Sequence, residues 1–149
     1  MSSAIITATL DQIEDLVPLF DAYRVFYKQP SDLEAARTFL SERLYLGESM
    51  IFLAYHEGRP VGFTQLYPLF SSTSMKRIWL LNDLYVVPDL RGQRIGEQLI
   101  QRAADVMRSF GAVRLKLSTQ TTNLSGQKLY ERVGFVRDTE FYAYNLDLS

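Results

Sequence analysis

The residues best suited to chemistry lie in one segment of the chain, residues 84–96, with the sequence LYVVPDLRGQRIG. A strand-like run ends at Pro88 and a helix-like run begins at Ile95, so a turn joins the two. Such a turn directs unpaired backbone N–H groups and the positive end of the helix dipole toward one point, which suits a phosphate or pyrophosphate group. Two glycines let a ligand approach the backbone closely, and Arg91 adds positive charge. The spacing fits a solvated loop, whose glycines serve only the turn, equally well.

Composition and the missing motifs exclude several other functions. The chain has 149 residues with 16 basic and 17 acidic side chains, and its net charge of −1 gives no positive field for nucleic acid. It contains no cysteine, which excludes disulfides, thiolate zinc sites and a cysteine nucleophile, and we expect no metal site. Neither G-x-x-x-x-G-K-[ST] nor G-x-G-x-x-G occurs. No segment approaches the roughly 20 apolar residues of a membrane helix, and we expect a cytoplasmic protein.

Two segments resemble the motifs of one enzyme family. Residues 91–96, RGQRIG, resemble the Arg/Gln-x-x-Gly-x-Gly/Ala acetyl-CoA motif of the GNAT superfamily of N-acetyltransferases, and the preceding residues 81–88 are similar to its fourth strand. Residues 123–135, NLSGQKLYERVGF, resemble the Asn…Leu-Tyr-Glu-x-x-Gly-Phe segment of the same family. Two motifs in the correct order and separation are far more specific than either alone.

The resemblance implies an activity. An enzyme of this kind transfers an acetyl group from acetyl-CoA to a primary amine by direct attack in a ternary complex. The acceptor would be a small molecule, such as a polyamine or an amino-acid-like compound, or a lysine side chain. A non-catalytic acyl-CoA-binding or regulatory module is the alternative, and an assembly unit that adds its aromatic last strand to a partner's sheet is a third.

One position departs from the family motif. Arg94 stands where the motif usually has its first glycine. A backbone conformation that favours glycine is therefore in question at this position. The guanidinium group of Arg94 could instead contact a phosphate of CoA. Both interpretations stay open.

The resemblance also assigns residues to the cofactor. Backbone groups of the fourth strand would hold the pantetheine arm of CoA, and one N–H there would polarise the thioester carbonyl. Those groups are free only if the fourth and fifth strands splay apart, which the family implies. The cofactor-binding residues are then Leu84, Tyr85, Val86, Arg91, Gly92, Gln93, Arg94, Ile95, Gly96, Asn123 and Tyr130.

Acid and base candidates follow from the same resemblance. Tyr130 is the candidate acid, because a phenol with a pKa of about 10 stays protonated at neutral pH and is roughly matched to a thiolate; simple packing of its ring is the alternative. Asn123 could cap the following helix or bind the pantetheine amide. Asp83 is the candidate base, directly or through water, unless it is paired with a cation. Some polyamine-type members carry an acid where this chain has Asn82, and the single histidine, His56, is expected to be exposed.

The acceptor pocket is expected at the first two helices and the turn between them. Carboxylates beside aromatic rings suit a cationic amine through charge and cation–π attraction, although packing of the rings against the sheet fits equally well. The Tyr-Arg-x-Phe-Tyr segment, residues 23–27, also resembles the branch that includes yeast histone and polyamine acetyltransferases. The clustered residues are Asp21, Tyr23, Arg24, Phe26, Tyr27 and Asp32, and we assign Tyr23, Arg24, Tyr27 and Asn82 to the acceptor.

Hydrophobic periodicity predicts the elements that position these residues. Helices are expected after the capping-box patterns at Thr9 and Ser31, from residue 95 to 110, and around residues 125–132. Strands are expected at residues 5–8, 50–55, 61–69, 77–87, 113–117 and 141–146. Because a strand, a helix and a strand follow one another after residue 77, the sequence predicts a parallel pair.

Together these elements predict an α/β (α+β) fold of the GNAT type. We expect a mixed, mostly antiparallel twisted sheet of about six or seven strands, flanked by about four helices, with its central parallel pair splayed at the cofactor site. We also expect one N-acetyltransferase domain, 1–149, and a homodimer that uses the last strand or its neighbours.

Overall fold

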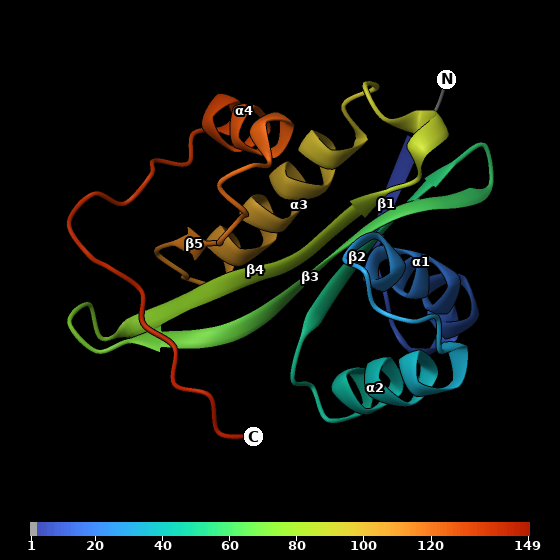
Figure 1. Ribbon diagram of the computed structural model, residues 1–149, viewed down its shortest axis with the longest axis horizontal. Coiled ribbons are helices and arrows are strands. Elements are labelled where there is room, and N and C mark those ends of the chain that lie inside the picture. The colour runs from blue at the N-terminus through green and yellow to red at the C-terminus, as the bar shows by residue number, and fades with distance from the viewer. Residues whose placement is uncertain (1–2) are drawn as a thin grey trace. The chain divides into compact units, whose positions relative to one another are not determined.

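The computed structural model describes residues 3–149 and contains two compact units, which divide between Ser118 and Thr119. The first unit contains β1 (Ser3–Thr7), η1 (Leu10–Gln12), α1 (Ile13–Phe26), α2 (Leu33–Tyr45), β2 (Met50–His56), β3 (Arg59–Ser71), β4 (Lys76–Val86), η2 (Pro88–Leu90), α3 (Ile95–Ser109) and β5 (Leu115–Lys116) (Figure 1). The second unit contains α4 (Leu124–Val133). The single domain predicted from the sequence stays a prediction.

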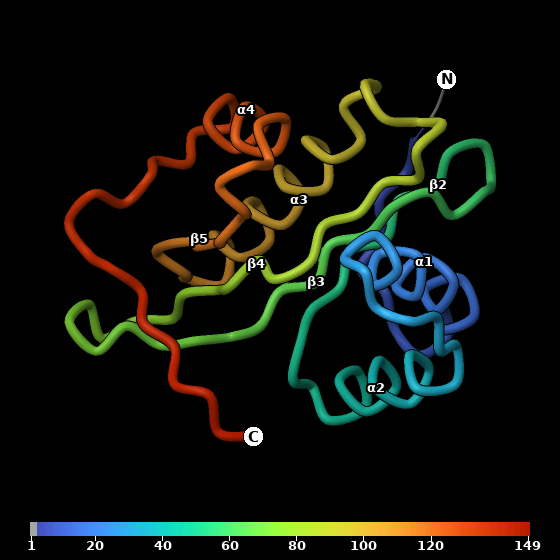
Figure 2. The backbone as a smooth tube through the Cα atoms, viewed as in Figure 1, coloured from blue at the N-terminus to red at the C-terminus, as the bar shows by residue number. Residues whose placement is uncertain are grey.

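The sheet of the first unit has five strands in the order β1-β2-β3-β4-β5. The first three pairings are antiparallel, and β4 pairs with β5 in parallel, as the strand–helix–strand succession predicts. This arrangement confirms the mixed, mostly antiparallel sheet with one parallel pair. Figure 2 traces the chain from β4 through a loop, which includes η2, into α3.

The predicted strand at residues 141–146 is wrong. In the part of the chain that the structure describes, the sheet has five strands instead of six or seven, and residues after Val133 form neither helix nor strand. Tyr142, Tyr144 and Leu146 alternate with smaller or more polar residues, which is the pattern of a strand, but each side chain is exposed. A strand also needs a neighbouring strand to hydrogen bond with, and alternation along the sequence does not provide one.

The helices cover both faces of the sheet. Figure 1 shows α1 and α2 on one face and α3 on the other. On the first face Phe20 and Leu40 pack with Leu53, Phe63 and Tyr85 of the sheet in one buried cluster. On the second face the apolar stripe of α3 that the sequence predicts is buried, including Ile95, Leu99, Ala103 and Met107. No helix within residues 3–149 has the length and apolar character needed to span a membrane.

The N-terminal ends of the first two helical segments show how local residues set their positions. Thr9 and Gln12 form the predicted capping box at the start of η1. At α2 the cap is Asp32, whose carboxylate accepts a hydrogen bond from the amide of Ala35 at 3.0 Å. Ser31, the predicted cap, instead donates a hydrogen bond to the carboxylate of Asp21 at 2.6 Å. The turn between α1 and α2 is thus fixed by two carboxylates.

A β-bulge interrupts the pairing of β3 and β4. Gln65 lies opposite Asp83 and Leu66 lies opposite Leu81, so Asn82 is an extra residue in β4. Asn82 is exposed, whereas Asp83 is buried on the face that α1 covers. The bulge therefore places a buried carboxylate on the face where the acceptor pocket is predicted.

Candidate active site

The edge of β4 is open over the segment that the family uses for its cofactor. Among the described residues, β4 and β5 pair only at Trp79 with Leu115 and at Leu80 with Lys116. Beyond Leu80, β4 continues to Val86 without a partner on this side, and in Figure 1 its arrow runs far past that of β5. This is the separation of the parallel pair that the family resemblance implies.

Two backbone amides face this open edge. The N–H of Val87 donates to the carbonyl of Val61 in β3 at 2.9 Å. Because N–H groups alternate in direction along a strand, those of Val86 and Leu84 point away from β3, toward the open edge. The carbonyl of Val86 supports this direction, since it accepts a hydrogen bond from Nε of Arg91 at 2.9 Å. The amides of Leu84 and Val86 are therefore placed to donate to a ligand that lies along β4.

The N-terminus of α3 is the second group of donors in this region. Its N-cap is Arg94, and no side chain caps the helix. The first bond within the helix runs from the amide of Gln98 to the carbonyl of Arg94 at 3.0 Å, so the amides of Ile95 and Gly96 have no carbonyl one turn earlier. Ile95 is buried, with its side chain in the core, whereas Gly96 beside it is half-buried. Uncapped amides and the helix dipole form a site that fits a pyrophosphate.

The turn before α3 contains two residues in the left-handed region. Gly92 has φ 84°. Arg94 has φ 63° and ψ 20°, a conformation that favours glycine and is unfavourable for other residues by roughly 1–2 kcal/mol. The conformation that the family motif assigns to glycine is thus kept with arginine in place. The guanidinium of Arg94 lies 3.1 Å from the carboxylate of Glu97 in the first turn of α3. Gln93, which lies between Gly92 and Arg94, is exposed.

Arg91 is held by the protein itself. Besides its bond to Val86, its guanidinium carbon lies 5.4 Å from the ring centre of Phe26 and 5.5 Å from that of Tyr85. These are cation–π distances. Arg91 therefore links the turn before α3 to the end of α1. Its positive charge is held beside Phe26, Tyr85 and the carbonyl of Val86.

Asp83 has an unusual environment for a carboxylate. Its side chain is 4% exposed, and no lysine or arginine within residues 3–149 forms an ion pair with it. Burial raises its pKa, and hydrogen bonds from Gln65, Tyr23 and Asn82 act in the opposite direction. The structure therefore contradicts the alternative that Asp83 is paired with a cation. A buried carboxylate with a raised pKa is suited to take up a proton.

The predicted acceptor residues divide into two groups. The hydroxyl of Tyr23 donates to the carbonyl of Asn82 at 3.3 Å, which brings both residues next to Asp83. The ring of Tyr23 packs 5.1 Å from Tyr27 and 6.4 Å from Tyr85. These aromatic residues are packed together and also lie next to the candidate base.

The remaining predicted acceptor residues stabilise the turn between α1 and α2. Arg24 donates to the carbonyl of Pro30 at 3.2 Å. Asp21 is buried and accepts from the amide of Asp32 at 2.8 Å. Asp32 caps α2, as described above. Their side chains are engaged in local structure, so the aromatic residues and Asp83 are better placed to contact an acceptor.

Gln65 and Tyr67 are neighbours of Asp83 that the sequence does not identify. Both stand in the middle of β3, and a glutamine inside the mostly apolar run of residues 61–69 is a weak signal that could have marked the site. The pKa of Tyr67 is raised to about 12, first by burial and then by the charge of Asp83, while the charge of Arg43 acts in the opposite direction. Arg43 lies on α2, so α2 also contributes to this side of the site.

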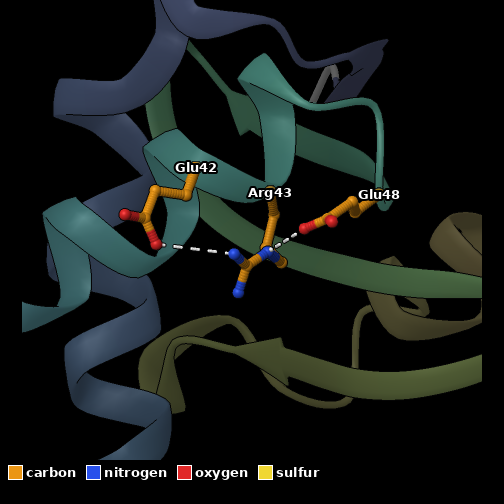
Figure 3. A network of polar contacts seen from close by, with 3 residues as sticks. All are labelled: Glu42, Arg43 and Glu48. Atoms are coloured by element: carbon orange, nitrogen blue, oxygen red, sulfur yellow. Dashed lines mark hydrogen bonds and ion pairs between the residues drawn. The ribbon is translucent and has the colours of Figure 1, made fainter.

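Figure 3 shows how Arg43 is held. Its Nε lies 2.8 Å from Glu48 and its Nη2 lies 3.5 Å from Glu42. Its guanidinium carbon also lies 4.6 Å from the ring centre of Phe39. Two carboxylates and an aromatic ring hold Arg43, the cation that lowers the pKa of Tyr67, so its charge is compensated by its own neighbours.

The second unit contains Asn123 and Tyr130. Asn123 is the N-cap of α4: its side-chain oxygen accepts from the amide of Gly126 at 3.1 Å, and its Nδ2 donates to Thr119 at 3.0 Å. A Cβ at position 126 would lie 2.4 Å from Nδ2 of Asn123, so this cap requires glycine there. Tyr130 is half-buried, and its ring lies 5.9 Å from that of Phe135 at an interplanar angle of 73°. The capping role of Asn123 is confirmed, and the ring of Tyr130 packs as the alternative interpretation describes.

Comparisons with known proteins agree with this fold. Residues 13–135 match the model of the Acetyltransferase (GNAT) family. An uncharacterized N-acetyltransferase of Bacillus subtilis, YhfO, is 47% identical over 133 residues, which are 89% of each chain. The crystal structure of a probable acetyltransferase superposes with a TM-score of 0.94 at 45% identity and covers 98% of both chains.

A more distant relative has a named acceptor. The thialysine N-epsilon-acetyltransferase of Caenorhabditis elegans is 25% identical over 150 residues, which cover 96% of this chain and 91% of that protein. Together with the open edge of β4 and the uncapped start of α3, the family match over most of the chain identifies the type of enzyme. The chain belongs to the GNAT family of N-acetyltransferases.

Proposed function

We propose that this N-acetyltransferase transfers the acetyl group of acetyl-CoA to a primary aliphatic amine by direct attack in a ternary complex. The observation that carries the proposal is the sequence of donors along one edge: the amides of Leu84 and Val86, then the uncapped N-terminus of α3. This order matches the parts of an extended acyl-CoA, a thioester with an amide-containing arm that ends in a pyrophosphate.

The donor half of the reaction uses main-chain groups. An amide of β4, at Leu84 or Val86, donates to the thioester oxygen and stabilises the negative charge that develops on it. The amides of Ile95 and Gly96 bind the pyrophosphate, with Gly92 allowing the turn to approach it closely. Gln93 and Arg94 flank these amides from the same turn.

The acceptor half uses side chains. The amine arrives as an ammonium ion, since its pKa is near 10, and Asp83 takes up the proton directly or through a water molecule. The free amine attacks the thioester carbon and forms the C–N bond, and the nitrogen, now positively charged, loses its second proton to water. The C–S bond then breaks, and Tyr130 protonates the departing thiolate. The phenolate regains a proton from solvent, and Asp83 releases to solvent the proton that it took up.

The acceptor is an alkylammonium compound, such as a polyamine, an amino-acid-like molecule or a lysine side chain. Asp83 is a buried carboxylate without a cationic partner among the described residues, and the rings of Tyr23 and Tyr27 offer cation–π contacts. The acceptor of the Caenorhabditis elegans relative, thialysine, carries its amine at the end of such a chain. The cytoplasmic location and the homodimer remain predictions.

A product assay tests the proposal. The protein is incubated with acetyl-CoA and a mixed panel of polyamines, amino acids and lysine peptides, and both free CoA thiol and the mass of acetylated amines are followed. We expect thiol release that depends on both substrates and a product 42 Da heavier than an aliphatic amine. Saturable CoA binding without turnover of any amine would contradict the proposal and favour an acyl-CoA-binding module.

A further inference from the structure

Gln65 is the side chain that faces Asp83 across the sheet. The two residues lie opposite each other in the register of β3 and β4, and Nε2 of Gln65 donates to Oδ2 of Asp83 at 2.8 Å. Gln65 is 0% exposed. The only partner described for a hydrogen bond from its side chain is therefore Asp83, the candidate base of the reaction.

The orientation of the Gln65 amide is informative. With Nε2 on Asp83, the other end of the amide, Oε1, is buried and has no hydrogen-bond partner within the part of the chain that the structure describes. A buried acceptor without a partner is unfavourable. The reverse orientation would place Oε1 at 2.8 Å from a carboxylate oxygen, which is worse. Because the Asp83 carboxylate needs a hydrogen-bond donor, the Gln65 amide lies with Nε2 toward it.

The other donors to Asp83 are also neutral. Nδ2 of Asn82 donates to Oδ1 of Asp83 at 3.0 Å, and the hydroxyl of Tyr23 approaches from α1. An adjacent cation would hold the carboxylate ionised and make it a poor base, whereas neutral donors fix its orientation and leave it able to accept a proton. Both carboxylate oxygens are therefore oriented by amides.

We propose that Gln65 is a positioning residue for acetyl transfer, which holds the Asp83 carboxylate in the orientation and ionisation state that the acceptor amine requires. The proposal rests on the proposed function, in which Asp83 is the base. Gln65 itself is fully buried and acts through Asp83.

The other ionisable groups near Asp83 come from three elements. Tyr23 of α1 hydrogen bonds with it, and Tyr67 of β3 is close enough that the charge of Asp83 raises the pKa of its phenol. Arg43 of α2 acts on Tyr67 in the opposite sense and is held by its two glutamates (Figure 3). None of these groups changes when Gln65 is replaced, so a shift in the titration of Asp83 would report on the amide.

The test is the pH profile of kcat/KM for Gln65→Leu, which keeps the side chain's approximate size and removes its donor. Loss of a hydrogen bond to the ionised carboxylate raises the pKa of Asp83 further, so the acidic limb should move to higher pH by about one to two pH units, with activity recovering at alkaline pH. Asn82→Ala removes the donor to the other oxygen from an exposed position and should move the limb in the same direction. Asn82→Ala also tests the proposal if Gln65→Leu does not fold.

Tyr55→Phe is the matched control. It removes a hydrogen bond of 2.5 Å to the carboxylate of Asp15 from another strand of the same sheet. Its acidic limb should stay in place. Loss of activity by the same factor at every pH in Gln65→Leu, as a structural role predicts, would overturn the proposal.

A carbon-13 NMR titration of the Asp83 carboxyl group separates this proposal from the proposed function, because it needs no turnover. The midpoint for Asp83 should be higher in Gln65→Leu than in the wild-type protein, and equal midpoints would overturn the proposal. A wild-type protein that acetylates no amine would contradict the proposed function instead, and the titration would still decide whether Gln65 controls Asp83.

Discussion

The two sides of the candidate site use different parts of the chain. On the donor side, from Leu84 to Gly96, the groups that face a ligand are backbone amides, and the side chain of Ile95 is buried in the core. On the acceptor side the groups are side chains, above all Asp83, with Gln65 and Tyr23 around it. Backbone donors survive most substitutions, because every residue except proline carries them. Activity should therefore depend on residue identity on the acceptor side far more than on the donor side.

Neighbouring substitutions in β4 give the strongest test of this difference. Asp83→Asn removes the base and should lower kcat/KM by about 10²–10⁴-fold, the usual contribution of general acid–base catalysis. Leu84→Ala keeps the backbone N–H of residue 84, which neighbours Asp83, and should lower kcat/KM less than about tenfold. Steady-state kinetics, with acetyl-CoA varied at a saturating concentration of the amine, measures kcat/KM in both variants. Similar losses in the two variants would show that the donor side also depends on side chains.

Tyr130→Phe tests the proposed acid of the reaction. Removing the proton of the phenol should slow turnover at least about tenfold, because the thiolate then leaves unprotonated. A thioester of a more acidic thiol should narrow the gap, since its thiolate leaves without help. Tyr142→Phe is the control, as its phenol is exposed and has no assigned role. Equal rates in the wild-type protein and Tyr130→Phe would leave its packing on Phe135 as its role.

Asp83 should also reduce stability at neutral pH. Burial raises the pKa of Asp83, so the folded state binds this proton more tightly than the unfolded state does. The stability that results is complete below the ordinary Asp pKa of about 3.9 and is lost as pH rises through the raised value. Asp83→Asn cannot ionise, and Gln65 can turn its amide to bond with it. Urea denaturation should show a larger free energy of unfolding for Asp83→Asn at pH 7 than for wild type, and a smaller difference at pH 4. A destabilised variant at pH 7 would contradict this ionisation argument.

The contrast also explains how far the sequence could predict the site. The elements around the donor side follow from hydrophobic periods and from the turn after Pro88, and the order of elements up to α4 agrees with the prediction. The contact between Gln65 and Asp83 depends on the register of β3 and β4 and on the bulge at Asn82. No local pattern encodes a register or a single inserted residue, so the sequence identifies Asp83 but not the side chain that holds it.

The last strand is a failure of a different kind. Residues 141–146 are rich in aromatic side chains and alternate as a strand should, and the sequence predicts a strand there. In the structure these residues are exposed and unpaired with any other described strand. Alternation reports which side chains could share a face, whereas a strand forms only where another backbone supplies hydrogen bonds.

Substitutions of Arg94 should have the smallest effect on activity. They test the comparison most finely, because they change a side chain on the donor side, where the backbone amides face the ligand. The left-handed conformation of Arg94 should make Arg94→Gly more stable than Arg94→Ala, by about 1 kcal/mol after the greater freedom of glycine in the unfolded chain is allowed for. Both variants lose the guanidinium and its contact with Glu97, so they differ only in the strain of the folded backbone and in the freedom of the unfolded chain.

The KM for acetyl-CoA in these two variants decides between the two interpretations of Arg94. If the donor side works through its amides, KM should change less than about threefold in both, since each keeps the N–H groups at the start of α3. A rise of tenfold or more in both would assign the guanidinium to a phosphate of CoA. A rise in Arg94→Gly alone would instead mean that the arginine stiffens a turn that glycine leaves loose, in which case the side chain serves the amides by restricting the backbone that carries them.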